Sequence, residues 1–100
     1  MRRGRPKKVR IIRKDPEVRQ FSPRGRRGRP GDSLLKFEEL EAIRLADHMG
    51  LSQKDAAQFM GVSQQTFSRV LKNARGTVSE ALVKGKIIRV YGGDYKVTKY

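Results

Sequence analysis

Two serines eleven residues apart constrain this chain more than any other feature of its sequence. Ser52 and Ser63 can each accept hydrogen bonds from the free amides that open a helix. Gly61 stands between them, where a first helix over residues 53–60 has to stop and the chain has to reverse at positive φ. Two short helices joined by a tight turn are therefore predicted, the helix-turn-helix arrangement that is typical of DNA-binding proteins.

The apolar residues of this stretch fit two crossing helices. Ala57 is predicted near the centre of the first helix, where a small side chain allows the second helix to approach closely. The side chains expected between the two helices are Ala56, Met60, Val62, Phe67, Val70 and Leu71. The outward face of the second helix is left with Gln64, Gln65, Thr66, Ser68, Arg69 and Lys72. No acidic residue interrupts that face.

This polar face suits the edges of DNA bases. Gln can pair through two hydrogen bonds with adenine and Arg with guanine, while Ser and Thr hydroxyls reach bases or phosphates. The residues expected to read bases in the major groove are Gln64, Gln65, Ser68 and Arg69. The residues expected to contact phosphates are Gln53, Lys54, Ser63, Thr66, Lys72 and Arg75. The competing interpretation is an ordinary helical bundle with a solvated polar face.

Gln53 and Gln64 open the two helices of this unit. They resemble the glutamine pair that phage repressors place at equivalent positions. In that pair, one glutamine contacts the DNA backbone and braces the other.

The net charge points to the same class of partner. The chain has 100 residues, enough for one small domain, and a formal net charge of +14 from 24 Lys and Arg against 10 Asp and Glu. Residues 1–31 hold 13 of the basic and 2 of the acidic side chains. Such an excess favours a partner of dense negative charge, of which nucleic acid is the commonest.

The basic N-terminal region carries a short internal repeat. Arg-Arg-Gly-Arg-Pro occurs at residues 2–6 and again at residues 26–30. It resembles the AT-hook, in which an extended Gly-Arg-Pro core lies in a narrow A·T minor groove. The arginines that this interpretation places in the groove are Arg3, Arg5, Arg27 and Arg29. The alternative is general phosphate contact without sequence choice.

A further helix is predicted ahead of the two motif helices. Phe37, Leu40, Ile43 and Ala46 recur at helical spacing, which predicts a helix from about residue 37 to about residue 48. The other face of this helix carries Glu41 and Arg44, with Leu45 as a candidate partner contact. The acids Glu38, Glu39 and Glu41 are interpreted as helix-start residues, because no base, nucleophile or metal ligand accompanies them.

The helical period continues beyond the motif and then gives way to strands. The second motif helix is expected to run to Lys84 and to stop at Gly85, with Gly76 as a point of bending. Its apolar stripe past residue 74 is either a self-association surface, which would make a homodimer, or core packing. Residues 86–91 and 95–100 flank a glycine turn and predict a β-hairpin, although residues 87–91 can instead pair with a short strand at residues 9–13.

The expected fold is therefore mainly α. A tri-helical helix-turn-helix domain with a long recognition helix occupies residues 32–84. A basic, largely flexible arm precedes it at residues 1–31, and a short C-terminal β-hairpin follows at residues 85–100.

Several functional classes are disfavoured by what the sequence lacks. The absence of cysteine removes disulfides and thiolate metal sites, and the single His48 makes a histidine metal cluster or a Ser-His-Asp triad implausible. We therefore expect no enzyme, no catalytic residues, no metal and no cofactor. No membrane span or signal peptide is evident, so a cytoplasmic, nucleoid-associated location is expected.

The chain also resembles a family of small prokaryotic proteins of unknown role that are described as predicted DNA-binding proteins. Their helix-turn-helix is similar to region four of bacterial sigma factors. The matching pieces include Gly4-Arg5-Pro6-Lys7-Lys8, Phe37-Glu38-Glu39-Leu40-Glu41-Ala42, Gly50-Leu51-Ser52-Gln53, Met60-Gly61-Val62-Ser63 and Gln65-Thr66-Phe67. The chain departs from the family pattern at Lys36, Gln64 and Gly76. The resemblance implies a role in transcription but no specific target.

The first functional hypothesis is sequence-selective binding of double-stranded DNA by a transcription regulator, without a membrane partner or a small-molecule substrate. An RNA-associated structural protein is the alternative that size and charge fit equally well, although the sequence shows no aromatic stacking surface. A nucleoid-packing protein without sequence choice is the third.

Overall fold

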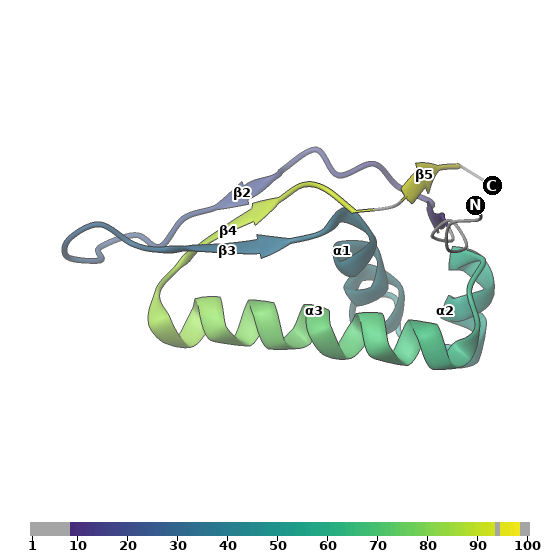
Figure 1. Ribbon diagram of the computed structural model, residues 1–100. Coiled ribbons are helices and arrows are strands. Elements are labelled where there is room, and N and C mark those ends of the chain that lie inside the picture. Colours follow the sequence, from purple (N-terminus) through teal and green to yellow (C-terminus); the bar gives the residue numbers. More distant parts are fainter. Residues whose placement is uncertain (1–8, 94, 99–100) are drawn as a thin grey trace, which may run out of the picture.

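One long helix, α3 (Gln64–Lys84), forms the base of the structure (Figure 1). The structure is a computed structural model and describes residues 9–93 and 95–98. The other helical segments stand over the N-terminal half of α3: α1 (Phe37–Ile43), the π-helical turn η1 (Arg44–His48) and α2 (Gln53–Met60). The strands are β1 (Arg10–Ile12), β2 (Gln20–Phe21), β3 (Asp32–Leu35), β4 (Ile87–Val90) and β5 (Tyr95–Val97).

The strands form two small sheets. In the three-stranded sheet, β4 lies in the centre, antiparallel to β2 and parallel to β3. In the two-stranded sheet, β5 pairs in parallel with β1. The expected mainly α, tri-helical helix-turn-helix fold is therefore wrong, because the chain builds an α+β domain. The expected C-terminal β-hairpin is wrong as well, and so is its alternative, the pairing of β4 with residues 9–13.

Long-range hydrogen bonds explain why the two C-terminal strands do not pair with each other. The amide of Ile87 donates to the carbonyl oxygen of Gly31 at 2.8 Å, and the amide of Thr98 donates to that of Ile12 at 2.8 Å. An isolated two-stranded hairpin is marginal in water. Pairing with the N-terminal strands instead places Ile12 and Val90 in one shared core, where both are buried.

Part of the expected flexible arm consequently belongs to the fold. The strand predicted at residues 9–13 is present as β1, and residues 20–21 form β2. Residues 22–31 connect β2 to β3 and project past the C-terminal end of α3 (Figure 1). The first copy of the Arg-Arg-Gly-Arg-Pro repeat, with Arg3 and Arg5, lies outside the described residues.

The predicted ends of α2 and α3 are confirmed. The side chain of Ser52 accepts a hydrogen bond from the amide of Asp55, and that of Ser63 accepts one from the amide of Thr66. Gly61 ends α2 with a φ of 68°, a conformation that glycine adopts without steric cost. A Cβ at this position would also lie 3.1 Å from Cδ1 of Ile11, so the turn is crowded as well as left-handed. A left-handed glycine likewise ends α3, as predicted, directly after Lys84.

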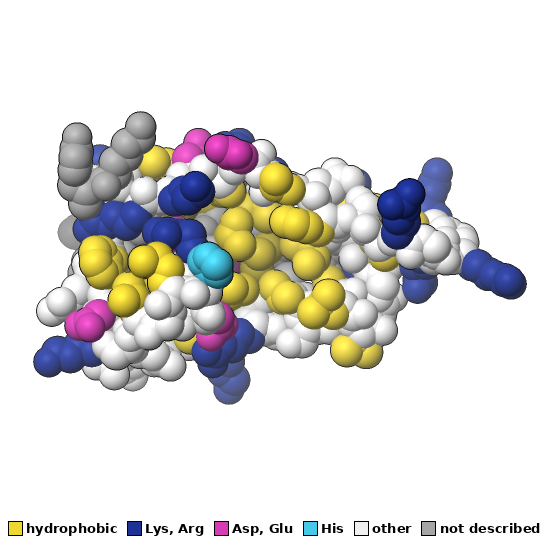
Figure 2. Space-filling model, turned by 180° about the vertical axis from the view of Figure 1, so that it is seen from behind, with side chains coloured by type: hydrophobic (Ala, Val, Ile, Leu, Met, Phe, Trp, Pro, Cys, Tyr) yellow, Lys and Arg dark blue, Asp and Glu magenta, His cyan; other side chains and the backbone are white. Residues whose placement is uncertain are grey.

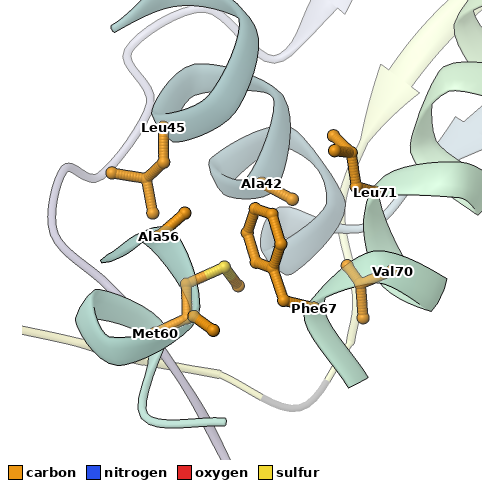
Figure 3. Packing of buried hydrophobic residues seen from close by; sticks show 8 residues of the cluster. Ala42, Leu45, Ala56, Met60, Phe67, Val70 and Leu71 are labelled. Carbon is orange, nitrogen blue, oxygen red and sulfur yellow. The ribbon is translucent and has the colours of Figure 1, made fainter. Parts of the chain in front are cut away.

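Two apolar clusters hold the elements together. The first joins α1, η1, α2 and the first half of α3, and Figure 3 shows Phe67 between Met60 and Ala42 at its centre. The small Ala57 is buried in this cluster, as expected for two helices that cross closely. The second cluster joins the sheets to the later part of α3: Ile12, Leu35, Phe37, Ala74 and Val90. Ala74, the partly buried Val78 and the buried Ala81 belong to the core, whereas Leu82 at the end of the same apolar stripe is 74% exposed. Core packing is therefore confirmed for the stripe as far as Ala81, and self-association through its exposed end stays a prediction.

The π-helical turn η1 places Leu45 differently from the sequence-based expectation. The amide of Met49 donates to the carbonyl oxygen of Arg44, five residues back, at 2.8 Å. Such a turn holds more residues than an α-helical turn and changes the direction of the side chains within it. Leu45 is only 2% exposed and packs in the first cluster, so its proposed role as a partner contact is wrong.

Gly76 leaves α3 unbroken, and this gives a prediction about stability. A Cβ built at Gly76 meets nothing within 4 Å, and its backbone lies inside a continuous helix. We expect Gly76→Ala to raise the free energy of unfolding by about 0.5–1 kcal/mol, because alanine restricts the unfolded chain and favours the helix. Urea unfolding followed by circular dichroism measures this change. A lower unfolding midpoint would show that position 76 requires glycine.

Candidate nucleic-acid interface

The first turns of α3 present polar and basic side chains to solvent. Phe67, Val70 and Leu71 anchor one side of the helix in the first cluster. Helical periodicity then turns the opposite side outward. The residues predicted to read bases, which are Gln64, Gln65, Ser68 and Arg69, are all exposed, and so is Lys72. Within residues 9–93 and 95–98, no carboxylate forms an ion pair with Arg69 or Lys72. The face is therefore open and free of paired acids.

Gln53 couples the start of α2 to this face. The hydroxyl of Ser68 donates a hydrogen bond to Oε1 of Gln53 across the junction of the two helices. The contact orients Ser68 and leaves the amide nitrogen of Gln53 available. Among the hydrogen bonds of the described residues, Gln53 contacts Ser68 and none joins it to Gln64. This bond joins residues 15 positions apart, so no local sequence signal indicated it.

Three further predicted phosphate contacts lie at the rim of the face. Lys54 is exposed in the first turn of α2. Ser63 and Thr66 hydrogen-bond to each other at 3.0 Å while Ser63 caps α3. Capping uses one lone pair of the serine oxygen, and the free amides of the first turn of α3 still point along the helix axis. A helix start of this kind favours anions.

Arg75 is not free, in contrast to its predicted role. Its guanidinium donates to both carboxylate oxygens of Asp47 in η1, at 2.6 and 3.1 Å. The hydrogen bond from Arg75 holds the pKa of Asp47 below its usual range. Arg75 therefore enters any phosphate contact only in competition with Asp47, a partner that sequence reasoning missed because it lies 28 residues earlier.

The arginines of the second Arg-Arg-Gly-Arg-Pro copy do not lie on this face of α3. Arg27 and Arg29 are exposed in the segment between β2 and β3, and the guanidinium of the neighbouring Arg26 donates to the carbonyl oxygen of Lys84 at 3.0 Å. This segment lies at the C-terminal end of α3, whereas Arg69 belongs to the second turn of that helix (Figure 1). From Arg69 to Lys84 the helix advances about 22 Å, so the two groups are too far apart to share one groove contact.

Comparison with known proteins places the chain in a family. Residues 1–98 match the model of a family described as "Protein of unknown function DUF134". The chain belongs to this family. Its resemblance to uncharacterised prokaryotic proteins is thereby confirmed, whereas the family description names no activity. No solved structure matches the chain.

Relatives in this family carry equally neutral names. A UPF0251 protein of Methanococcus maripaludis strain C7 is 43% identical over 97 residues, which cover 96% of this chain and 75% of the relative. A UPF0251 protein of Thermoanaerobacter pseudethanolicus is 48% identical over 94 residues, which cover 93% of this chain and 80% of the relative. A UPF0251 protein of Halothermothrix orenii is 47% identical over 97 residues, which cover 96% of this chain and 72% of the relative. None of the helices in the described ranges is both long and apolar enough to cross a membrane.

Proposed function

We propose that the protein binds double-stranded DNA sequence-selectively and acts as a regulator of transcription. In this proposal α2 and α3 act as a helix-turn-helix element within the α+β domain, and the first turns of α3 enter the major groove. The observation that carries it is the exposed, acid-free face formed by Gln64, Gln65, Ser68 and Arg69. Amide, hydroxyl and guanidinium groups on one helix face match the donor and acceptor pattern of base edges.

Charge supports the same proposal. A net charge of +14 attracts the phosphate backbone at long range, and Lys54 and Lys72 flank the reading face at its two ends. Arg27 and Arg29 supply a second positive region beside the other end of α3, which lies roughly 22–30 Å from the reading residues along the helix axis. The second region is therefore assigned to phosphates or to a neighbouring minor groove.

The test of base reading is the variant Arg69→Ala. We expect it to weaken binding to the preferred duplex by about 1–3 kcal/mol and to relax base preference at one position, because a bidentate contact to guanine is lost. The preferred duplex comes from selection of binding sites from a random DNA pool. Arg24→Ala is the matched control, since Arg24 is exposed in the segment between β2 and β3. That variant should weaken preferred and random duplexes by the same factor.

Two outcomes would contradict the proposal. Equal losses on preferred and random duplexes for Arg69→Ala would favour a packing protein without sequence choice. Stronger binding of structured RNA than of duplex DNA at one salt concentration would favour the RNA-associated alternative.

The ion pair between Asp47 and Arg75 gives a further prediction. We expect Asp47→Asn to raise affinity for preferred and random duplexes alike, by roughly two- to fivefold, because it releases Arg75 for phosphate contact. Asp55→Asn is the matched control, since it removes the same charge from the neighbouring α2 without freeing an arginine. Fluorescence anisotropy titrations at constant salt compare the two. Identical gains for both variants would show that only net charge matters.

A further inference from the structure

A groove of about 680 Å³ is lined by residues to which the proposed DNA contact assigns no role. Its apolar lining comes from three separate parts of the chain: Leu45 and Met49 at η1, Phe59 on α2, and Val97 on β5. Its polar lining comes from Arg13, Lys14, Asp15 and Arg44. Figure 2 shows basic and apolar side chains next to each other on this face of the molecule. None of the described lining residues belongs to α3.

The apolar side of the groove is unusually open to solvent. Met49 is 52% exposed, Phe59 is 43% exposed and Val97 is 39% exposed. Single exposed apolar residues are ordinary, but three exposed apolar side chains from different elements lining one hollow are not. Leu45 provides a buried floor beneath them. A hollow of this volume and lining is in the range of sites for small organic molecules.

The charges at the groove define what such a molecule has to carry. Arg44 is neutralised by Glu41, to which it donates two hydrogen bonds of 2.8 Å. The carboxylate of Asp15 accepts hydrogen bonds from Arg19. The positive charges that remain are those of Arg13 and Lys14, and Lys14 has no ion-pair partner among residues 9–93 and 95–98.

Arg13 is also held in place. Its Nε donates to the carbonyl oxygen of Phe59 at 3.0 Å, and its guanidinium carbon lies 5.6 Å from the centre of the Phe59 ring. The two remaining guanidinium nitrogens keep donors for an anion. A positioned arginine and a lysine without an ion pair to any described residue therefore line the same groove as the apolar side chains.

We propose that this groove binds an amphipathic organic anion, with its apolar body against Met49, Phe59 and Val97 and its acidic head between Arg13 and Lys14. The occupant is a small molecule that bears a carboxylate, sulfonate or phosphate group. Apolar contact supplies affinity, and the charge-assisted hydrogen bonds select for the acidic head. The site is independent of the proposed DNA function and can be tested without DNA.

The probe for this test is 8-anilinonaphthalene-1-sulfonate, with N-phenyl-1-naphthylamine as a counterpart of nearly the same body that lacks the sulfonate. We expect the sulfonate to bind one site, with amide NMR shifts concentrated at Lys14, Met49, Phe59 and Val97. The neutral counterpart should bind at least about tenfold more weakly. Shifts spread over all basic residues would show nonspecific ion pairing and overturn the proposal.

Two variants with matched controls test the roles of charge and apolar surface. We expect Lys14→Gln to weaken binding of the sulfonate roughly fivefold and Phe59→Ser roughly tenfold. Lys54→Gln makes the same change, and Leu82→Ser a comparable loss of apolar surface, at exposed positions outside the groove; both should leave binding unchanged. Equal losses in variants and controls would overturn the site. A thermal melt of each variant confirms that it is folded, and loss of binding in a folded Lys14→Gln protein supports the assignment.

Discussion

Phe67→Ala is expected to lower the free energy of unfolding by about 4 kcal/mol. Phe67 has no exposed surface and belongs to the buried cluster that also contains residues of α1, η1 and α2 (Figure 3). Truncation removes the transfer free energy of the ring and leaves a cavity between helices that cannot close independently. The free energy of unfolding of a domain of this size is about 5–15 kcal/mol, so the expected loss is a large fraction of the total.

Urea unfolding measured by circular dichroism tests this expectation. The matched control is Phe21→Ala, because Phe21 is 54% exposed on β2. The control should cost under about 1 kcal/mol. The melting temperature of the Phe67 variant should fall by roughly 20 °C. Similar costs for the two variants would mean that the junction of α2 and α3 contributes little to the stability of the domain.

Sequence reasoning located Phe67 because local rules govern the elements around it. Capping serines, a left-handed glycine and the helical spacing of apolar residues act within a few positions of each other, and they determine the ends of α2 and α3. The exposure of Gln64 and Arg69 follows from the same periodicity. The sequence therefore predicted which side chains of the candidate interface share the exposed face of α3.

The sheets were not predictable in the same way. The C-terminal strands were located close to their observed positions, but their partners lie more than 50 residues earlier in the chain. Nothing in an apolar stretch such as residues 87–90 specifies which other strand it meets. The apparent hairpin satisfied local turn rules, while the observed pairing buries Val90 against Ile12 and Leu35. Burial shared by distant segments decided the pairing.

Arg75 and Glu41 show the same limit for charged residues. From the sequence alone, both residues were expected to be solvated charges. In the structure, each forms an ion pair with a specific partner. Arg75 is held by Asp47 from η1, so it is masked as a phosphate contact. Glu41, expected on an outer helix face, has a side chain that is only 1% exposed. The π-helical turn that follows α1 lies directly beside it and carries its partner Arg44.

Glu41 is the buried group on which the second large effect depends. Its two oxygens accept three hydrogen bonds of 2.8 Å, two from the guanidinium of Arg44 and one from the backbone amide of Arg13. The carboxylate thereby ties α1 to the segment that follows β1. Breaking a buried ion pair by removing one partner costs about 3–5 kcal/mol, because the remaining group is left without compensation.

We expect Glu41→Gln to destabilise the protein by about 3 kcal/mol, at the lower end of that range because the side chain of Arg44 is 24% exposed and can turn toward water. The amide keeps the size of the carboxylate but turns one acceptor into a donor that faces Arg44 or the amide of Arg13. Glu80→Gln is the matched control, since Glu80 pairs with Lys86 at the surface and should leave the urea midpoint nearly unchanged. Should Glu41→Gln unfold at the same urea concentration as Glu80→Gln, the buried pair would contribute nothing beyond a solvent-exposed one, and the attachment of β1 to α1 would rest on apolar packing alone.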